Sequence, residues 1–438
     1  MNSRIVFAGT LLAGLCASAS VPTVSNVTTT QDVSRRVTVN YTLSGEAGIV
    51  TLTAQTNRGD DVWVDVGDDA LSYAAGDVNK VVEPGNRSLT WLPHKSWPDH
   101  FITGGKIRIG VKAWAKDAPP DYMVVSLVTP SNKWFYASAG AIPGGVQDEK
   151  YKTDYLVLRK CPAANVTWRM GSPTTESSRT AGNEVPHEVT LSNDYYIGVY
   201  LITQRQWELL TGERPSAFKK DYLTRALDKG CSYELIRGST ASTGAYYWPV
   251  KGHAVDPTSF MGKLRAKTGV EFDLPTDAQW EFASRAGCGS ALYDGTELET
   301  NADGVSANLS RLARYNKNGG SLPSGMSEAD CPVEYGPPSV GSYAPNAWGI
   351  YDTLGTIWEW CLDKFTEDLT KDDPYYKSPT RKIDPETGPW STSTANRVLR
   401  GGQRASAAGS CRCASRSYGN VANANGGGFR VACPATVE

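Results

Sequence analysis

The sequence predicts an α+β protein, with an N-terminal all-β sandwich followed by a larger domain that holds little regular secondary structure. Three observations support this prediction. Apolar and polar residues alternate with period two through the first 130 residues, as in half-buried strands. The alternation then fades, above all in the stretch 287–341, which is rich in Gly, Ser, Asn and Asp. The segment 345–361, PNAWGIYDTLGTIWEWC, gathers four large aromatic residues and must be buried.

Residues 1–19 have the pattern of a secretory signal. Arg4 precedes an apolar run over 5–16, and Ala17-Ser18-Ala19 supplies the small residues of a cleavage site. We expect a mature chain that starts at Ser20 and is exported to the periplasm, the cell surface or the medium. The apolar run is shorter than the ~20 residues that span a bilayer, so we expect no transmembrane segment in the mature chain.

The sandwich is predicted for residues 20–135, as a fibronectin-like or immunoglobulin-like domain. Val37, Val39, Tyr41 and Leu43 alternate with polar residues, and similar alternation recurs over 50–54, 88–92 and 107–114 between turn residues. Residues 136–150 are small, glycine-rich and charged, which is typical of a linker. We therefore place the second domain at 151–438 and expect few contacts across the linker.

The charge balance bears on the possible partners of the protein, and the cysteine count bears on its disulfides. The 44 Lys and Arg residues nearly balance 46 Asp and Glu, and no basic run stands out, so no nucleic acid or acidic membrane is indicated as a partner. One of the nine cysteines, Cys16, lies in the signal, and the other eight lie beyond residue 160. An even number in an exported chain favours disulfides, although eight cysteines allow 105 pairings.

Two helices have clear start signals. Thr203 is the expected N-cap of a helix over 203–211, and Thr276 that of a helix over 276–285. Gln279 stands three residues after Thr276, which completes a capping box. Trp280 and Ala283 share a face of the second helix, so we expect it to be mostly a core element.

Five ordered motifs in the second domain resemble the formylglycine-generating enzyme family, also called the sulfatase-modifying factor family. They are WRMGS at 168–172 with a following Glu184, Pro186 and His187; YYIGVYLITQRQW at 195–207; DLPTDAQWEFASRAG at 273–287; the aromatic segment 345–361; and NRVLRGG, CRCASR and GGGFRV within 396–431. The resemblance implies a C-type-lectin-like fold that is poor in regular secondary structure.

The resemblance also implies a chemistry. Such enzymes oxidise a sulfatase cysteine with oxygen and a copper ion held by two thiolates, which soft Cu(I) prefers. The family places its cysteine pair after the Gly-Gly turn, where this chain has small residues over 405–410. Cys411 and Cys413 are then weak catalytic candidates, because on a strand both would point to the same face.

Disulfides are the alternative use of these thiols. The family pairs the cysteine of its RCAAR motif with one near the end of the preceding helix, which here implies Cys413 with Cys288. We further expect Cys411 with Cys361, and Cys161 with Cys433 as a tie between the domain ends. Cys231 and Cys331 remain to pair with each other.

Calcium is a second cofactor that the family implies. Asn308 and Leu309 resemble one ligand segment, and Glu359 is retained in another, in which Thr356 replaces an asparagine. Oxygen ligands of this kind suit the hard Ca²⁺ ion. His187 has no second histidine at metal-ligand spacing, so we expect no iron or zinc site there.

Three functions follow from these patterns. The preferred hypothesis is an exported, non-oxidase family member that acts as a binding or envelope module for a protein or glycan ligand. The second is a copper-dependent oxidase with a site at Cys411 and Cys413, whose partner would be a sulfatase. The third is a displayed ligand-binding protein whose surface over 404–425 offers adaptable polar contacts. Whether the protein is an enzyme is left open.

Overall fold

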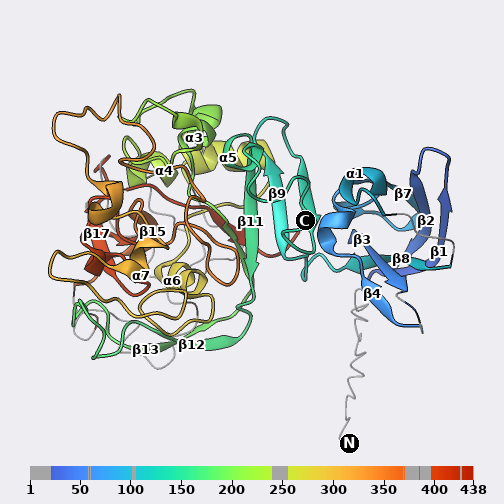
Figure 1. Ribbon diagram of the computed structural model, residues 1–438, viewed down its shortest axis with the longest axis horizontal. Helices are drawn as coiled ribbons and strands as arrows, with labels where there is room; N and C mark the ends of the chain where they lie inside the picture. Colours follow the sequence, from blue (N-terminus) through green and yellow to red (C-terminus); the bar gives the residue numbers. More distant parts are fainter. Residues whose placement is uncertain are drawn as a thin grey trace, which may run out of the picture.

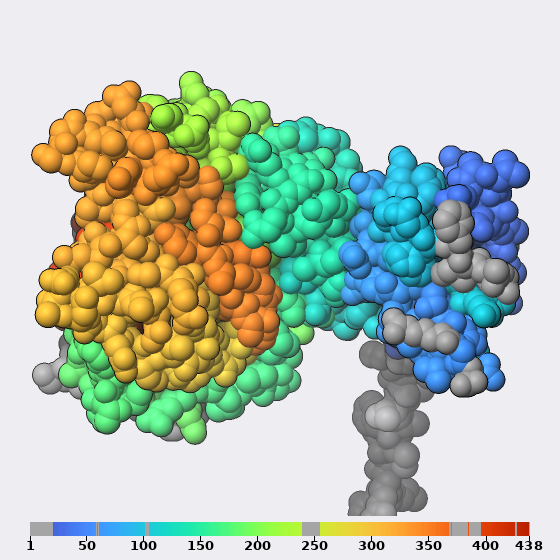
Figure 2. Space-filling model, in the orientation of Figure 1, coloured from blue at the N-terminus to red at the C-terminus, as the bar shows by residue number. Residues whose placement is uncertain are grey.

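The computed structural model describes residues 21–57, 59, 61–100, 105–238, 255–367, 369, 384, 396–424 and 427–437. The expected signal over 1–19 lies outside these residues. Figure 1 shows a small β-rich lobe, built from β1 to β8, beside a larger body that begins at β9. The space-filling view shows the same two lobes in contact (Figure 2).

The small lobe is the predicted sandwich of two antiparallel sheets. One sheet has the order β1-β2-β7-β5, and in the other β3 pairs with β4, β6 and β8. Its elements are β1 (Thr23–Gln31), β2 (Val37–Ser44), β3 (Gly48–Asn57), β4 (Trp63–Asp65), η1 (Asp68–Leu71), β5 (Ala74–Gly76), β6 (Val81–Val82), β7 (Gly85–Trp91), α1 (Pro93–Ser96) and β8 (Ile107–Trp114).

The predicted alternation is confirmed in β2, where Val37, Val39, Tyr41 and Leu43 are buried and their neighbours are more exposed. These side chains meet Val50, Leu52 and Ala54 of β3 in one apolar cluster. The cluster holds the two sheets together without a cysteine, since burial of each such side chain contributes roughly 1.5–3 kcal/mol.

The expected boundary at residue 135 is wrong. β9 (Tyr122–Ser126) and β10 (Lys133–Tyr136) pair with each other, and β9 pairs with β11 (Tyr155–Cys161) of the second domain. All five residues of β9 are buried. Their apolar run therefore belongs to a strand covered on both faces, which alternation cannot assign to a partner sheet. The sandwich ends after β8.

The expected linker is also packed rather than open. Ile142 is fully buried within a cluster that includes Tyr151 and Val340, and Lys150 bonds the carbonyl of Pro143 at 2.9 Å. The lobes touch directly as well: Ile49 of the sandwich is part of the core cluster of the second domain. We expect few contacts between the domains, and Ile49 provides an apolar contact that joins them.

The second domain is built on a five-stranded sheet with the order β10-β9-β11-β14-β18, accompanied by the pair β12-β13 and the sheet β15-β16-β17. Its remaining strands are β12 (Val166–Met170), β13 (His187–Leu191), β14 (Tyr195–Gly198), β15 (Glu359–Lys364), β16 (Asn396–Arg400), β17 (Arg416–Asn420) and β18 (Ala432–Pro434). The last strand lies beside β14, so both ends of the domain meet in one sheet.

Short helices fill the space around these sheets. They are α2 (Lys150–Thr153), α3 (Gln204–Thr211), η2 (Tyr222–Thr224), α4 (Tyr233–Arg237), α5 (Phe260–Thr268), α6 (Asp277–Arg285), α7 (Ala307–Ser310), η3 (Asn316–Gly320) and η4 (Ala408–Ser410). Both predicted helix starts are confirmed: Thr203 caps α3, and Thr276 with Gln279 forms the capping box of α6. No helix in the described part of the chain is long and apolar enough to cross a membrane.

Candidate functional site

The site begins at a tight turn after β16. Gly401 and Gly402 have positive φ angles of 87° and 80°, which glycine adopts without strain. A Cβ on Gly402 would lie 2.7 Å from the Sγ atom of Cys411, so only glycine fits there. The turn leads into a segment that is exposed at Ala405 and Ala407 and buried from Cys411 to the start of β17.

A pocket of about 260 Å³ opens beside this segment. One wall comes from η4 and the start of β17, a second from the loop between β12 and β13, and Trp358 completes the lining. The lining residues are Ser178, Thr180, Trp358, Ala407, Gly409, Ser410, Arg412, Ser415, Arg416 and Ser417. Half of them carry a hydroxyl group, which can both donate and accept hydrogen bonds.

Arg412 anchors one side of the pocket. Its guanidinium binds both carboxylate oxygens of Glu184 at 2.8 Å, contacts Glu176, and donates to the carbonyl of Ser178 at 2.8 Å. Arg412 and both glutamates are almost fully buried. Burial raises the pKa of Glu176, although the hydrogen bond from Arg412 opposes the rise. The three charged groups thus fix the β12–β13 loop against η4.

Arg416 anchors the other side through helix α6. Its Nε atom donates to Asp277 at 2.9 Å, and Arg400 contacts the same carboxylate from β16. Burial alone would raise the pKa of Asp277, but Arg400 and Arg416 together hold it below its usual value. Glu281 lies one turn further along α6. Its carboxylate forms ion pairs with the guanidinium groups of Arg400 at 2.6 Å and Arg285 at 2.8 Å.

The network beneath the pocket is electrically balanced. Its four guanidinium groups, on Arg285, Arg400, Arg412 and Arg416, face four carboxylates, on Glu176, Glu184, Asp277 and Glu281. The pocket therefore presents hydroxyls and bound guanidinium groups rather than a net charge. Such a lining suits a ligand that is itself rich in hydroxyl or amide groups.

Backbone strain accompanies this geometry. Ser178 has a φ of 62°, which is uncommon for a residue with a Cβ. Arg412 holds the carbonyl of this residue, and Gly409 packs so closely that a Cβ there would lie 2.7 Å from the Ser178 Cβ. Strained positions that the surroundings enforce gather at binding sites, which supports a functional role for the pocket.

Neither candidate thiol lines the pocket. Cys411 and Cys413 lie in a turn before β17, not on a strand, so the expectation that they share a strand face is wrong. Both are fully buried. Cys411 approaches the carbonyl of Ala407 at 3.8 Å, whereas Cys413 approaches the hydroxyl of Ser284 at 3.8 Å. Burial raises their pKa values to about 12 and about 11, so both thiols are protonated at neutral pH.

All eight cysteines beyond the expected signal are described, and each is a free thiol in this structure. Cys161 is paired across the sheet with Tyr195, while Cys433 is paired with Tyr196. Successive residues of a strand point to opposite faces. Cys161 and Cys433 therefore lie on opposite faces of the sheet, and the predicted bond between them is wrong.

Two further disulfides were expected, between Cys288 and Cys413 and between Cys361 and Cys411. Cys288 lies close enough to Cys413 to influence the ionisation of its thiol, and that pairing stays a prediction. Cys361 packs with Trp280 and Val398, in a different cluster from Cys411.

In the last expected pair, Cys231 and Cys331, each thiol contacts a different backbone carbonyl. The thiol of Cys231 contacts the carbonyl of Gly427 at 3.0 Å, whereas that of Cys331 contacts the carbonyl of Tyr335 at 3.3 Å.

The calcium candidates do not form one site. Both oxygens of Glu359 bind Arg430, at 2.6 and 2.8 Å, and both side chains are fully buried. Asn308 lies on α7, where its amide donates to the carbonyl of Glu297 at 3.1 Å, and the carbonyl of Leu309 accepts two backbone N–H groups. Arg430 thus engages both oxygens of Glu359, and calcium at Asn308, Leu309 and Glu359 stays a prediction.

His187, the remaining metal candidate that we considered, begins β13 and contacts the carbonyl of Val185 at 2.7 Å. In the described ranges, no three His, Cys, Asp or Glu side chains gather as a metal site would require.

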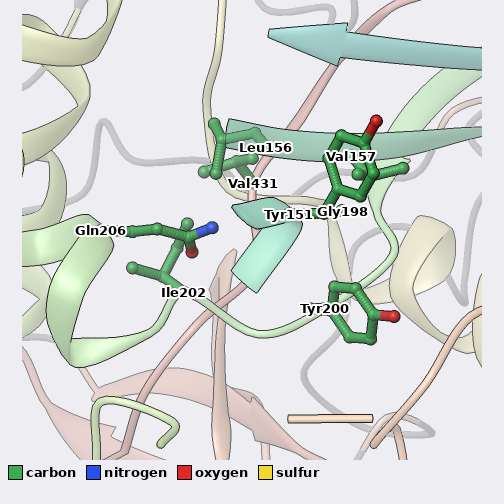
Figure 3. Close-up of a pocket in the computed structure, with 8 residues that line it drawn as sticks. All are labelled: Tyr151, Leu156, Val157, Gly198, Tyr200, Ile202, Gln206 and Val431. Atoms are coloured by element: carbon green, nitrogen blue, oxygen red, sulfur yellow. The ribbon is translucent and has the colours of Figure 1, made fainter. Parts of the chain in front are cut away.

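A second cavity lies between β11, β14 and the start of α3. Figure 3 shows Tyr151, Leu156, Val157, Tyr200 and Gln206 among its lining residues. Its volume of about 10 Å³ leaves room for one water molecule at most. The 260 Å³ pocket is therefore the better candidate for a ligand.

Sequence reasoning placed a ligand-binding surface over 404–425, and seven of the ten lining residues lie in that segment, but it missed their partners in the rest of the chain. The CRCASR motif drew attention through its cysteines, while its arginines, Arg412 and Arg416, form the walls. Their partners Glu176, Glu184 and Asp277 lie far away in sequence. The usable signal was the presence of several Arg and acidic residues in motifs that are otherwise apolar, because a buried charge requires a partner.

The fold and the pocket describe an α+β protein with a polar pocket beside β17. The model of the sulfatase-modifying factor enzyme 1-like domain matches residues 158–435. The chain therefore belongs to the sulfatase-modifying factor family, which includes the formylglycine-generating enzymes.

Individual relatives match at modest identity. Formylglycine-generating enzyme of Thermomonospora curvata is 29% identical over 266 residues, which cover 54% of this chain and 79% of that protein. Chaperone protein LppX of Paenibacillus barcinonensis is 29% identical over 191 residues, which cover 40% of this chain and 64% of that protein. Among solved structures, Treponema denticola variable protein 1 has a TM-score of 0.45 and 22% identity, covering 64% of this chain and 95% of that one.

Proposed function

We propose that the protein is an exported, non-oxidase member of the family, and that it binds a protein or glycan ligand in the pocket beside β17. One observation carries this proposal: the segment over 405–410, where the family's copper cysteines are expected, contributes Ala407, Gly409 and Ser410 to the lining and no thiol. A binding role needs the pocket alone, whereas the oxidase needs two thiolates that converge on a metal.

Two further observations favour binding. The hydroxyl-rich lining and the internally neutralised arginines suit a neutral polar group, such as a sugar or a peptide segment, better than a metal ion. One relative is named a chaperone rather than an oxidase, which is consistent with a binding role for some members of the family.

Catalysis is the first test. Purified protein is incubated with Cu(I), oxygen and a sulfatase-derived peptide that contains Cys-x-Pro-x-Arg, and mass spectrometry monitors the peptide cysteine. We expect no conversion to formylglycine. Conversion that disappears in Cys411→Ser or Cys413→Ser would establish the oxidase instead, with copper as its cofactor and a sulfatase as its partner.

Ligand binding is the second test. Ala407 is exposed at the rim of the pocket, and Ala405 is equally exposed but does not line it. We expect Ala407→Trp to abolish binding to an array of neutral oligosaccharides and peptides, because the indole fills the opening. Ala405→Trp is the matched control and should bind as the unaltered protein does. Equal binding by both variants would remove the pocket from the proposal.

A further inference from the structure

The face of β8 that points away from the sandwich core carries two exposed cations, and at its Trp114 end it packs against the core of the second domain. Lys106 and Lys116 lie in the bend and the turn that flank the strand, while Arg108, Gly110, Lys112 and Trp114 occupy alternate positions within it. Because side chains of a strand alternate between faces, these residues share one face and lie ~7 Å apart from position to position. The opposite face of β8, with Ile107, Ile109, Val111 and Ala113, packs against the sandwich core.

Two of these cations are held in place by tryptophan rings. The guanidinium carbon of Arg108 lies 3.8 Å from the ring centre of Trp63, and Nζ of Lys112 lies 3.4 Å from that of Trp114. Trp114 is itself fixed by a 2.8 Å hydrogen bond to Thr51. A charged side chain that is already ordered loses less conformational freedom when it binds a ligand. The stacked rings thus hold two charges whose Cα atoms are ~14 Å apart along the strand.

Hydrogen-bonding groups lie between and beside the cations. Gly110 has no side chain, and the hydroxyl of Thr53 lies directly against it, since a Cβ at Gly110 would be 2.5 Å from the Thr53 Oγ1 atom. Gln55, opposite Arg108, bonds Asp65 at 3.0 Å. The face therefore combines separated positive charges and the Asp65 carboxylate with hydroxyl and amide groups.

We propose that this face, made of Thr53, Gln55, Arg108, Gly110 and Lys112, binds an acidic polysaccharide. Such a chain offers carboxylate or sulfate groups to the cations and hydroxyl groups to Thr53 and Gln55, so both kinds of group find partners. An anionic lipid surface or a nucleic acid would also pair with the cations. It would offer fewer hydrogen-bond partners to Thr53 and Gln55. The cations already cover the tryptophan rings, which also disfavours stacking of nucleobases on them.

The experiment measures binding of the full chain to heparin and polygalacturonate, with dextran, single-stranded DNA and phosphatidylglycerol vesicles as comparison probes. We expect both acidic polysaccharides to bind and dextran not to bind. Affinity should fall when salt is raised from ~0.05 M to ~0.5 M, because salt screens exposed charges. Stronger binding to vesicles or DNA than to either polysaccharide would overturn the proposal.

Charge-neutralising variants localise the binding. Arg108→Gln with Lys112→Gln should weaken polysaccharide binding at least ~tenfold at low salt, since both pre-ordered charges are lost. Lys80→Gln with Lys95→Gln removes the same charge from other positions of the sandwich and should change the affinity less than ~twofold. Circular dichroism and melting curves confirm that both proteins are folded. Equal affinities of the two double variants would contradict the proposed face.

Discussion

The two lobes bury different kinds of residue. The sandwich core is apolar, with Thr51 and Ser72 as the buried polar residues in its described part. Beyond residue 170 the core contains buried guanidinium and carboxylate groups, among them Arg400, Arg412 and Arg430. The comparison teaches that the second lobe adds specific long-range ion pairs to an apolar core around few regular elements, whereas the first is held by the fit of two alternating sheets.

The largest expected effect comes from breaking one buried pair. Arg430 binds Glu359 through two hydrogen bonds, and neither side chain is exposed. We expect Arg430→Met to lower the free energy of unfolding by about 3–5 kcal/mol, because it leaves a buried carboxylate without a partner. Chemical denaturation measures this loss.

The double variant Arg430→Met with Glu359→Met sharpens that prediction. It removes both charges, so we expect it to be more stable than the single variant. A single variant that loses less than about 1 kcal/mol would show that the buried pairs do not stabilise the second lobe as described.

Asp352 should make the second lobe sensitive to pH. Its side chain is fully buried, Gly341 donates to one carboxylate oxygen at 2.7 Å, and the other oxygen has no partner among the described residues. Burial raises its pKa to about 6, with Glu359 adding to the rise and Arg430 and Lys152 opposing it. The folded state then binds the proton more tightly than the unfolded state.

The sign of the effect follows from that difference. The stabilisation by this proton is complete below the unfolded pKa near 4 and is lost as pH rises through about 6. Relative to the unaltered protein, Asp352→Asn should therefore gain about 3 kcal/mol of stability between pH 4 and pH 8. Denaturation curves at several pH values measure this gain, and a difference that does not vary with pH would contradict the burial of an unpaired carboxylate.

How much the sequence revealed differs between the lobes for a physical reason. The strands of the sandwich and the caps at Thr203 and Thr276 were predictable, because alternation and capping boxes depend on residues a few positions apart. The segment 404–425 could be predicted as a binding surface, but the ion pairs that shape its pocket could not. The pair between Arg412 and Glu184 joins residues 228 positions apart, and no local pattern records such a contact.

A strand that is buried on both faces has no polar side, so its sequence does not show which sheet it joins. The apolar run of β9 could pair in either lobe, which is why the boundary was misplaced. The sequence also could not show that Cys161 and Cys433 lie on opposite faces of the sheet, because this depends on the register of each strand with β14.

A smaller effect is expected at the start of α6. Thr276 is buried, and its hydroxyl accepts from the backbone N–H of Gln279 at 3.1 Å. Thr276→Ala should lower the free energy of unfolding by about 1 kcal/mol, since one helix N–H loses its partner. Thr276→Ser keeps the hydroxyl and serves as the control. Equal stability of the Ala and Ser variants would show that the cap does not contribute.

The smallest effect is expected for an ion pair on the sandwich surface. Lys80 lies 3.3 Å from Asp77, and both side chains are substantially exposed. Lys80→Met should change the free energy of unfolding by less than about 1 kcal/mol, because water screens the pair. A change as large as that of Arg430→Met would erase the contrast between the two lobes.

The central claim is that the pocket beside β17 is a thiol-free binding site, and Cu(I) stoichiometry tests it most directly. Reduced protein is titrated with Cu(I) in competition with a chromophoric chelator, alongside Cys411→Ser and Cys413→Ser. Since burial keeps both thiols protonated and they face different neighbours, we predict that neither variant loses a bound copper relative to the unaltered protein. One equivalent of tightly bound Cu(I) that disappears in both variants would contradict the account.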